Sequence, residues 1–191
     1  MDVMRIGILF LMINLISCTS VEKSEMKAAP ILEAETTQKI HQLVINEYSP
    51  KGIFVNESGE ETDWIELYNN SDSVLKIGAN EWYLSDDENE INKFALPEMS
   101  IEPHGFVLVL CDGKSSSEKY IHANFKISSD NETISLYHES ELADEIICNE
   151  DLKKKFSFGR ESDGQISWNK IKVPSPGVSN NSSENYAETA H

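Results

Sequence analysis

The fold is decided by one stretch near the middle of the chain, Asp63-Trp64-Ile65-Glu66-Leu67-Tyr68-Asn69. Its side chains alternate as they do along a β-strand, where successive residues point to opposite faces. Ile65 and Leu67 share one face, and we expect that face to meet a hydrophobic core. The side chains on the other face of the strand are then expected to cover the outer face of the sheet or a neighbouring loop. They are Trp64, Glu66 and Tyr68.

Similar short strands recur on both sides of this stretch, with turn residues about every 8–12 positions, the spacing of a β-sandwich. We expect the first strand to stop at Ser49-Pro50-Lys51-Gly52 and the strand 106–111, apolar on both faces, to be central. No long segment has the 3.6-residue period of a helix. The pattern predicts an all-β sandwich with strands at residues 43–48, 63–68, 74–77, 82–85, 93–96, 106–111, 133–137, 142–147, 156–158 and 165–171.

The beginning of the chain has the features of an export signal. The apolar run 6–16 follows Arg5 and is shorter than the roughly 20 residues that a bilayer-spanning helix needs. It ends in Leu15-Ile16-Ser17-Cys18, which resembles the lipobox of bacterial lipoproteins. That resemblance implies cleavage before Cys18 and a diacylglycerol, for example one that contains palmitate, on the sulfur of Cys18. Because the next residue is Thr19, it also implies delivery to the outer membrane. An ordinary signal peptide with a chance cysteine is the alternative.

The remaining chain divides by composition. Residues 18–41 are mixed polar and charged and are expected to be a lipidated N-terminus and flexible tether, and residues 42–178 one folded domain. Residues 179–191 are rich in Ser, Asn and Glu and are expected to be a disordered tail. Cys111 and Cys148 lie in apolar surroundings, so a disulfide and two buried free thiols both remain open.

The formal net charge of −17 limits the partners. Nucleic acid is bound by Lys and Arg that neutralise phosphates, so nucleic-acid binding is not expected. Such a charge also disfavours docking onto anionic lipid, so the lipid anchor would hold the protein to the membrane alone. Divalent cations and basic partners suit an acidic surface.

A family resemblance covers residues 43–178. The matching pieces occur in order along the chain, and together they resemble the lamin tail domain, which is common in bacterial exported proteins. The resemblance implies an immunoglobulin-like β-sandwich. Its main pieces are Ile45-Asn46-Glu47, the stretch 63–69, Trp82-Tyr83-Leu84-Ser85-Asp86, Ser157-Phe158-Gly159-Arg160 and Pro174-Ser175-Pro176-Gly177.

Several acids lie where expected strands begin or end. In a meander these positions fall at one pole, so Glu47, Asp63, Asp86 and Asp87 are expected to gather there. Clustered carboxylates repel each other unless a cation or proton intervenes, and Ca²⁺ takes 6–8 oxygen ligands. The hypothesis is a structural Ca²⁺ site. The alternative is that these acids are solvated or cap turns.

No motif of an enzyme stands out. The histidines do not pair at a metal-binding spacing, and there is no nucleophile elbow or phosphate loop. The expected function is therefore a non-catalytic binding, adhesion or structural module of the cell envelope, with a protein or glycan partner. A small exported hydrolase using clustered carboxylates is the alternative. Four aromatic residues could pack in the core or form a binding platform: Trp64, Trp82, Tyr83 and Trp168.

Overall fold

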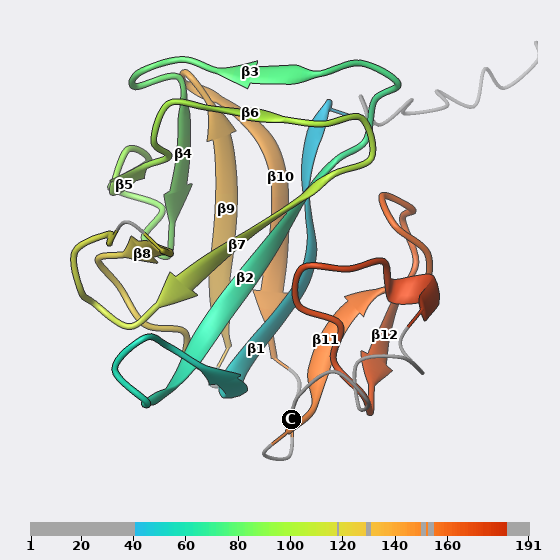
Figure 1. Ribbon diagram of the computed structural model, residues 1–191. Coiled ribbons are helices and arrows are strands. Elements are labelled where there is room, and N and C mark those ends of the chain that lie inside the picture. The colour runs from blue at the N-terminus through green and yellow to red at the C-terminus, as the bar shows by residue number, and fades with distance from the viewer. Residues whose placement is uncertain (1–40, 118, 129–130, 150–151, 153–154, 183–191) are drawn as a thin grey trace, which may run out of the picture. The chain divides into compact units, whose positions relative to one another are not determined.

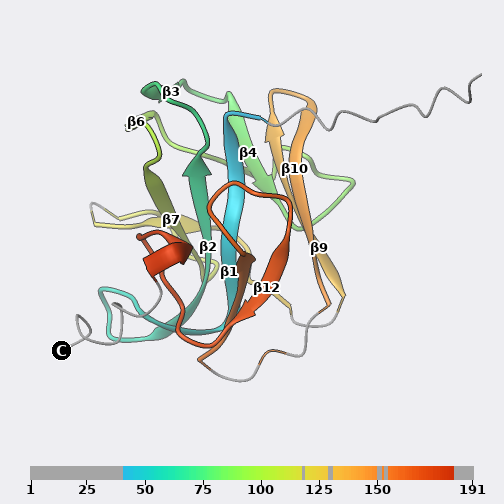
Figure 2. The ribbon, with the colours of Figure 1, turned by 90° about the vertical axis from the view of Figure 1, so that its right-hand side faces the viewer.

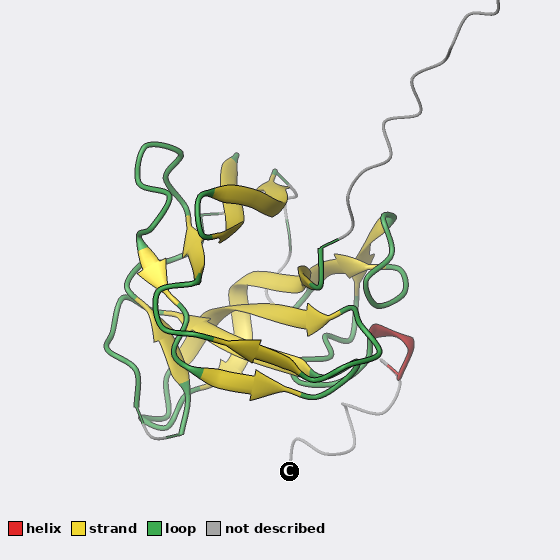
Figure 3. Cartoon of the chain, turned by 90° about the horizontal axis from the view of Figure 1, so that it is seen from above, coloured by secondary structure: helices red, strands yellow, loops and turns green. Residues whose placement is uncertain are grey.

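The computed structural model describes residues 41–117, 119–128, 131–149, 152 and 155–182. Cys18, the leader and nearly all of the expected tether lie outside these residues. Strands and loops make up almost all of the described chain, with one short 3-10 helix (Figure 3). The elements are β1 (Leu43–Val55), β2 (Glu61–Asn69), β3 (Leu75–Ile77), β4 (Trp82–Ser85), β5 (Phe94–Ala95), β6 (Met99–Ile101), β7 (Phe106–Cys111), β8 (Ile121–Ala123), β9 (Glu132–His138), β10 (Glu141–Cys148), β11 (Ser157–Arg160), β12 (Trp168–Ile171) and η1 (Asn180–Ser182).

The strands form three sheets, of which two are the layers of a sandwich (Figures 1 and 2). The larger has the order β12-β11-β1-β2-β7-β8, and the smaller has the order β10-β9-β4-β5. A two-stranded ribbon, β3-β6, completes the set. The strand pairings of the described residues are antiparallel except that of β7 with β8, which is parallel. The expected all-β, immunoglobulin-like sandwich is confirmed.

The core lies between the two larger sheets and follows the predicted alternation. Ile65 pairs in register with Tyr48 on β1 and Val109 on β7, and all three belong to the buried core. Leu84 on β4 and Leu136 on β9 reach the same core from the smaller sheet. Burying an aliphatic side chain of this size stabilises the fold by about 1.5–3 kcal/mol.

The opposite face of β2 is also buried, although it lies outside the core. Trp64 and Glu66 are fully buried and Tyr68 is 7% exposed. The prediction that these residues lie on the face away from the core is confirmed, and other parts of the chain cover them.

Several expected boundaries differ from the observed ones, and two of these differences affect the fold most. β1 does not stop at Ser49 but runs to Val55, with register irregularities between Ile45 and Glu47 and between Ser49 and Phe54. Extra unpaired residues at such irregularities let a strand continue past residues that cannot join the ladder, such as proline. The disordered tail was expected to begin at residue 179, yet Asn180 is buried and opens η1.

Both cysteines of the described chain are buried free thiols. Burial raises the pKa of Cys111 well above its ordinary value. It also raises the pKa of Cys148 to about 12, although a hydrogen bond with Tyr48 acts in the opposite direction. The sequence left open a disulfide or two buried free thiols, and the structure contains the free thiols.

Candidate functional site

The four acids expected at one pole do not come together. Glu47 lies in the middle of β1, because that strand continues to Val55, and its buried carboxylate accepts hydrogen bonds from Ser157 and Ser175. Asp63 lies near the start of β2 and pairs with Cys111 on β7. Only Asp86 and Asp87, which follow β4, line a common hollow.

No three His, Cys, Asp or Glu residues of the described ranges are arranged to hold a metal ion. The geometric premise of the calcium hypothesis was therefore wrong for Glu47. Asp63 has a different local role: its Oδ2 accepts the backbone N–H of Ile127 at 3.3 Å. Burial raises the pKa of Asp63 to about 6.

Asp86 and Asp87 belong to an acidic hollow of about 760 Å³ beside the smaller sheet. Its lining comes from β9 and β10, from the loop 86–93 that follows β4, and from Asn131 just before β9. Ligand pockets in proteins usually have about 300–1,000 Å³, so the hollow has room for a side chain or short segment of a partner. Its lining is Asp86, Asp87, Glu88, Asn89, Lys93, Asn131, Glu132, Thr133, Ser135, Tyr137 and Glu145.

Local hydrogen bonds fix the wall of the hollow. The hydroxyl of Ser85, at the end of β4, lies 2.8 Å from the carbonyl oxygens of both Asp87 and Glu90. The backbone N–H of Asn89 donates to Asp87 Oδ1 at 2.9 Å. This is the turn chemistry in which Asp and Ser side chains bind backbone groups a few residues away. The acids are thus held at the rim by the turn itself.

The charge of the hollow is strongly negative, since five carboxylates and one ammonium line it. The ammonium of Lys93 lies 2.6 Å from Asp86 Oδ1, and this contact raises the pKa of Lys93. Burial raises the pKa of Glu132, whose Oε2 accepts the backbone N–H of Ser128 at 2.7 Å. Hydrogen bonds from Asn89 lower the pKa of Asp87. The arrangement is suited to attract and hold cationic groups.

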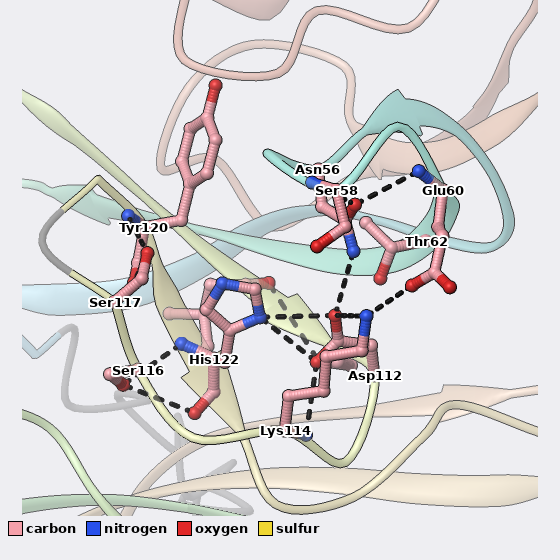
Figure 4. Close-up of polar contacts among 12 residues, drawn as sticks. Asn56, Ser58, Glu60, Thr62, Asp112, Lys114, Ser116, Ser117, Tyr120 and His122 are labelled. Carbon is pink, nitrogen blue, oxygen red and sulfur yellow. Dashed lines mark hydrogen bonds and ion pairs between the residues drawn. The ribbon is translucent and has the colours of Figure 1, made fainter.

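A second polar cluster surrounds His122 on β8 (Figure 4). His122 is 2% exposed, and its Nδ1 lies 3.0 Å from Asp112 Oδ1 while its Nε2 lies 3.1 Å from Glu57 Oε1. Asn56 Nδ2 donates to Asp112 at 3.3 Å, and the ammonium of Lys114 contacts Glu60. These contacts tie the turn after β1 to the loop between β7 and β8.

Hydrogen bonding controls the acids of this cluster. Burial acts to raise the pKa of Asp112, but hydrogen bonds from His122, Asn56 and the backbone of Lys114 outweigh it and lower the pKa. Hydrogen bonds, first from Ser117 and also from His122, lower the pKa of Glu57. A histidine acting as a general base needs one nitrogen free to face a nucleophile or substrate. Both nitrogens of His122 face carboxylates instead.

Comparison with known proteins gives the family. The model of the Lamin Tail Domain family matches residues 36–148, more than half of the chain. The chain belongs to the lamin tail domain family. No curated protein matches it with significance. The immunoglobulin-like domain of this family supports a non-enzymatic binding or structural role.

The lamin tail domain match ends at Cys148, whereas the described fold continues through β11, β12 and η1. Among the described residues, no helix has the length and apolar character to cross a bilayer. Sequence reasoning placed Asp86 and Asp87 at a strand end correctly but missed Glu132 and Glu145, which join them from β9 and β10. It gave no sign that His122 is buried.

Proposed function

We propose that this lamin tail domain protein is a non-catalytic binding module of the bacterial cell envelope. The acidic hollow beside β9 and β10 receives a Lys- or Arg-bearing segment of a partner protein. The observation that carries this proposal is the lining of the hollow, in which five carboxylates accompany a single ammonium. Charge complementarity of this kind speeds association and selects partners by the sign of their charge.

The position of Lys93 supports a cationic ligand. Its ammonium reaches into the hollow and contacts Asp86 at 2.6 Å, so the site already accommodates one group of this chemistry. Glu88 and Glu145 line the same hollow, and both are exposed and available to further cations. A Lys or Arg side chain of a partner would meet these carboxylates with charge-assisted hydrogen bonds.

A basic protein segment is favoured over a glycan by the placement of the aromatic residues. Sugar binding commonly uses exposed aromatic faces, yet Trp64 is fully buried and Trp82 is 3% exposed and stacks on His138 at 4.5 Å. Trp168 stacks on Phe158 with ring centroids 5.7 Å apart. Three members of the expected platform are thus engaged inside the domain. Nucleic acid is disfavoured by the net charge of −17.

The proposal of a lipid anchor rests on the leader. The apolar run 6–16 and the sequence Leu15-Ile16-Ser17-Cys18 support lipidation of Cys18, and Thr19 supports delivery to the outer membrane. Two or more acyl chains hold a protein stably at a membrane. Labelled palmitate should enter the wild-type protein and fail to enter Cys18→Ala, and equal labelling of the two would reject the anchor.

The proposal that the chain is not a hydrolase is supported by the cluster around His122. Its Nδ1 and Nε2 contact Asp112 and Glu57, and the side chain is 2% exposed, so it is poorly placed to activate a nucleophile. Ser117 hydrogen-bonds Glu57 and not the imidazole. The immunoglobulin-like family supports the same conclusion.

Binding at the hollow can be tested by calorimetry with residues 19–191 and short peptides of lysine, arginine or glutamate. We expect the basic peptides to bind and the acidic one not to bind. Glu145→Gln should weaken binding by about tenfold, the loss expected for one charge-assisted contact of roughly 1.4 kcal/mol. Glu98→Gln is the matched control, since Glu98 is exposed and lies outside the hollow.

Two results would reject the hollow as the binding site. Equal weakening by Glu145→Gln and Glu98→Gln would mean that only net charge matters. Binding of a cell-wall glycan that is insensitive to Glu145→Gln would identify a different partner and a different surface.

A further inference from the structure

Two glutamates lie side by side on the outer face of the six-stranded sheet. Glu47 on β1 pairs in register with Glu66 on β2, and both are fully buried. A third carboxylate, Asp163, lies next to them, because Asn46 Nδ2 is 3.0 Å from both Glu66 Oε1 and Asp163 Oδ1. None of these acids belongs to the acidic hollow.

The C-terminal part of the domain covers these carboxylates. We call residues 174–180 the C-terminal clasp. It donates to Glu47 from the backbone N–H of Ser175 at 3.2 Å and from its hydroxyl at 2.7 Å. The N–H of Gly177 donates to Glu66 Oε2 at 2.6 Å. Asp163 accepts the hydroxyl of Ser179 and the N–H of Asn180. The clasp is therefore attached to the sheet through three carboxyl groups.

Among the residues that the structure describes, no ion pair joins a basic side chain to Glu47 or Glu66. Arg160 is the nearest basic side chain on the adjoining strand, and it points elsewhere: Nε donates to the carbonyl of Ile45 at 2.7 Å and Nη2 to Asp144 at 2.7 Å. The charged group that faces Glu47 and Glu66 among the described residues is Asp163, which is also negative. Neighbouring buried carboxylates cannot all ionise without a large cost, so one of them tends to keep a proton.

The hydrogen bonds indicate which carboxyl keeps it. Glu47 accepts three donors, from the Ser157 hydroxyl and from the N–H and hydroxyl of Ser175. Glu66 accepts two, from Asn46 and Gly177. Donors stabilise the charged form, so the group with fewer of them is easier to protonate. Burial, followed by the charge of Glu47, raises the pKa of Glu66 well above its ordinary value.

We propose that a proton held by Glu66 keeps the C-terminal clasp docked, and that its loss at higher pH releases the clasp from β1 and β2. A group whose pKa is raised in the docked state stabilises that state at low pH, and the stabilisation is lost as the pH rises through the raised pKa. The opening of the clasp would uncover the carboxylates that it now satisfies. This inference is independent of ligand binding at the acidic hollow.

Hydrogen exchange of the full chain, followed by mass spectrometry between about pH 5 and pH 9, tests the proposal. After correction for the intrinsic exchange rate, protection of residues 174–180 in the wild type should fall by up to about tenfold per pH unit as the pH rises from the ordinary pKa of a glutamate to the raised pKa of Glu66, and should level off above it. Glu66→Gln should stay protected across the range, because its amide oxygen can accept Gly177 while Asn46 keeps Asp163 as a partner. Glu98→Gln, at an exposed position outside the hollow, should behave like the wild type.

Protection of the clasp that is independent of pH in the wild type would overturn the proposal. So would a pH dependence that is unchanged in a folded Glu66→Gln. An infrared spectrum of the wild type at neutral pH gives a test that needs no variant: a protonated buried carboxylic acid has its own C=O band, and absence of that band would also overturn the proposal.

Discussion

Asp63 offers a quantitative test of how burial sets a charge in this domain. In the wild type, the backbone N–H of Ile127 donates to Asp63 Oδ2 at 3.3 Å. The change is Asp63→Asn, which keeps an oxygen for this N–H but cannot ionise. Burial raises the pKa of Asp63 from 3.8 to about 6. A shift of this size corresponds to about 3 kcal/mol, which we reduce to about 1–2 kcal/mol because Asp63 is only partly buried and solvent screens its charge.

The sign follows from the direction of the shift. Below the unfolded pKa of 3.8 the carboxyl is neutral in both states, so wild type and Asp63→Asn should have nearly the same free energy of unfolding. As the pH rises through about 6, the wild type must bury a charge and loses stability, whereas the variant does not. Above this range, Asp63→Asn should be more stable by about 1–2 kcal/mol.

Urea unfolding at a series of pH values from about 4 to 8 measures this difference directly. Asp87→Asn is the control, since hydrogen bonds from Asn89 lower the pKa of Asp87 and its substitution should not stabilise the protein at high pH. A difference between wild type and Asp63→Asn that does not change with pH, or that makes the variant less stable at pH 8, would refute the reasoning.

Three further outcomes are expected. Arg160→Ala should lower the free energy of unfolding by about 3–5 kcal/mol, because it leaves Asp144 buried without its guanidinium partner. Arg160→Lys should restore little of this stability, since one ammonium cannot replace the forked contacts of the guanidinium. Recovery with lysine would contradict this. His122→Gln should lower the melting temperature, because one amide cannot contact Asp112 and Glu57 together as the imidazole does; an unchanged melting temperature would contradict this. Cys111 and Cys148 should resist iodoacetamide until urea unfolds the protein, and prompt labelling in the native state would contradict their burial.

The alternation of the stretch 63–69 was sufficient to place the core. Ile65 and Leu67 face it and Trp64 does not, because a strand alternates its faces whatever its neighbours are. Strands at 82–85 and 106–111 were also placed with their exact bounds, since turn residues flank each of them. These parts of the fold depend on local information, which a sequence contains.

The parts that failed depend on pairing between distant segments. β1 was ended too early because a proline and a glycine usually end a strand, and nothing local shows that β2 continues to pair beyond them. β8 is three residues long and owes its existence to parallel pairing with β7. The same limit applies to the sites: Glu132 and Glu145 join Asp86 only through the register of β9 and β10.

The two groups of acids on the sandwich differ in how far the chain itself satisfies them, and this difference decides which of them a partner can reach. Glu47 and Glu66 are fully buried and accept donors from the C-terminal clasp, so a ligand could reach them only after the clasp had moved. In the acidic hollow, by contrast, a single ammonium serves five carboxylates, and Glu88 and Glu145 are exposed. Exposed carboxylates such as Glu88 and Glu145 are available to an external cation without the loss of the contacts that hold the fold together. The hollow is therefore the surface at which this domain can bind a partner while its fold stays unchanged.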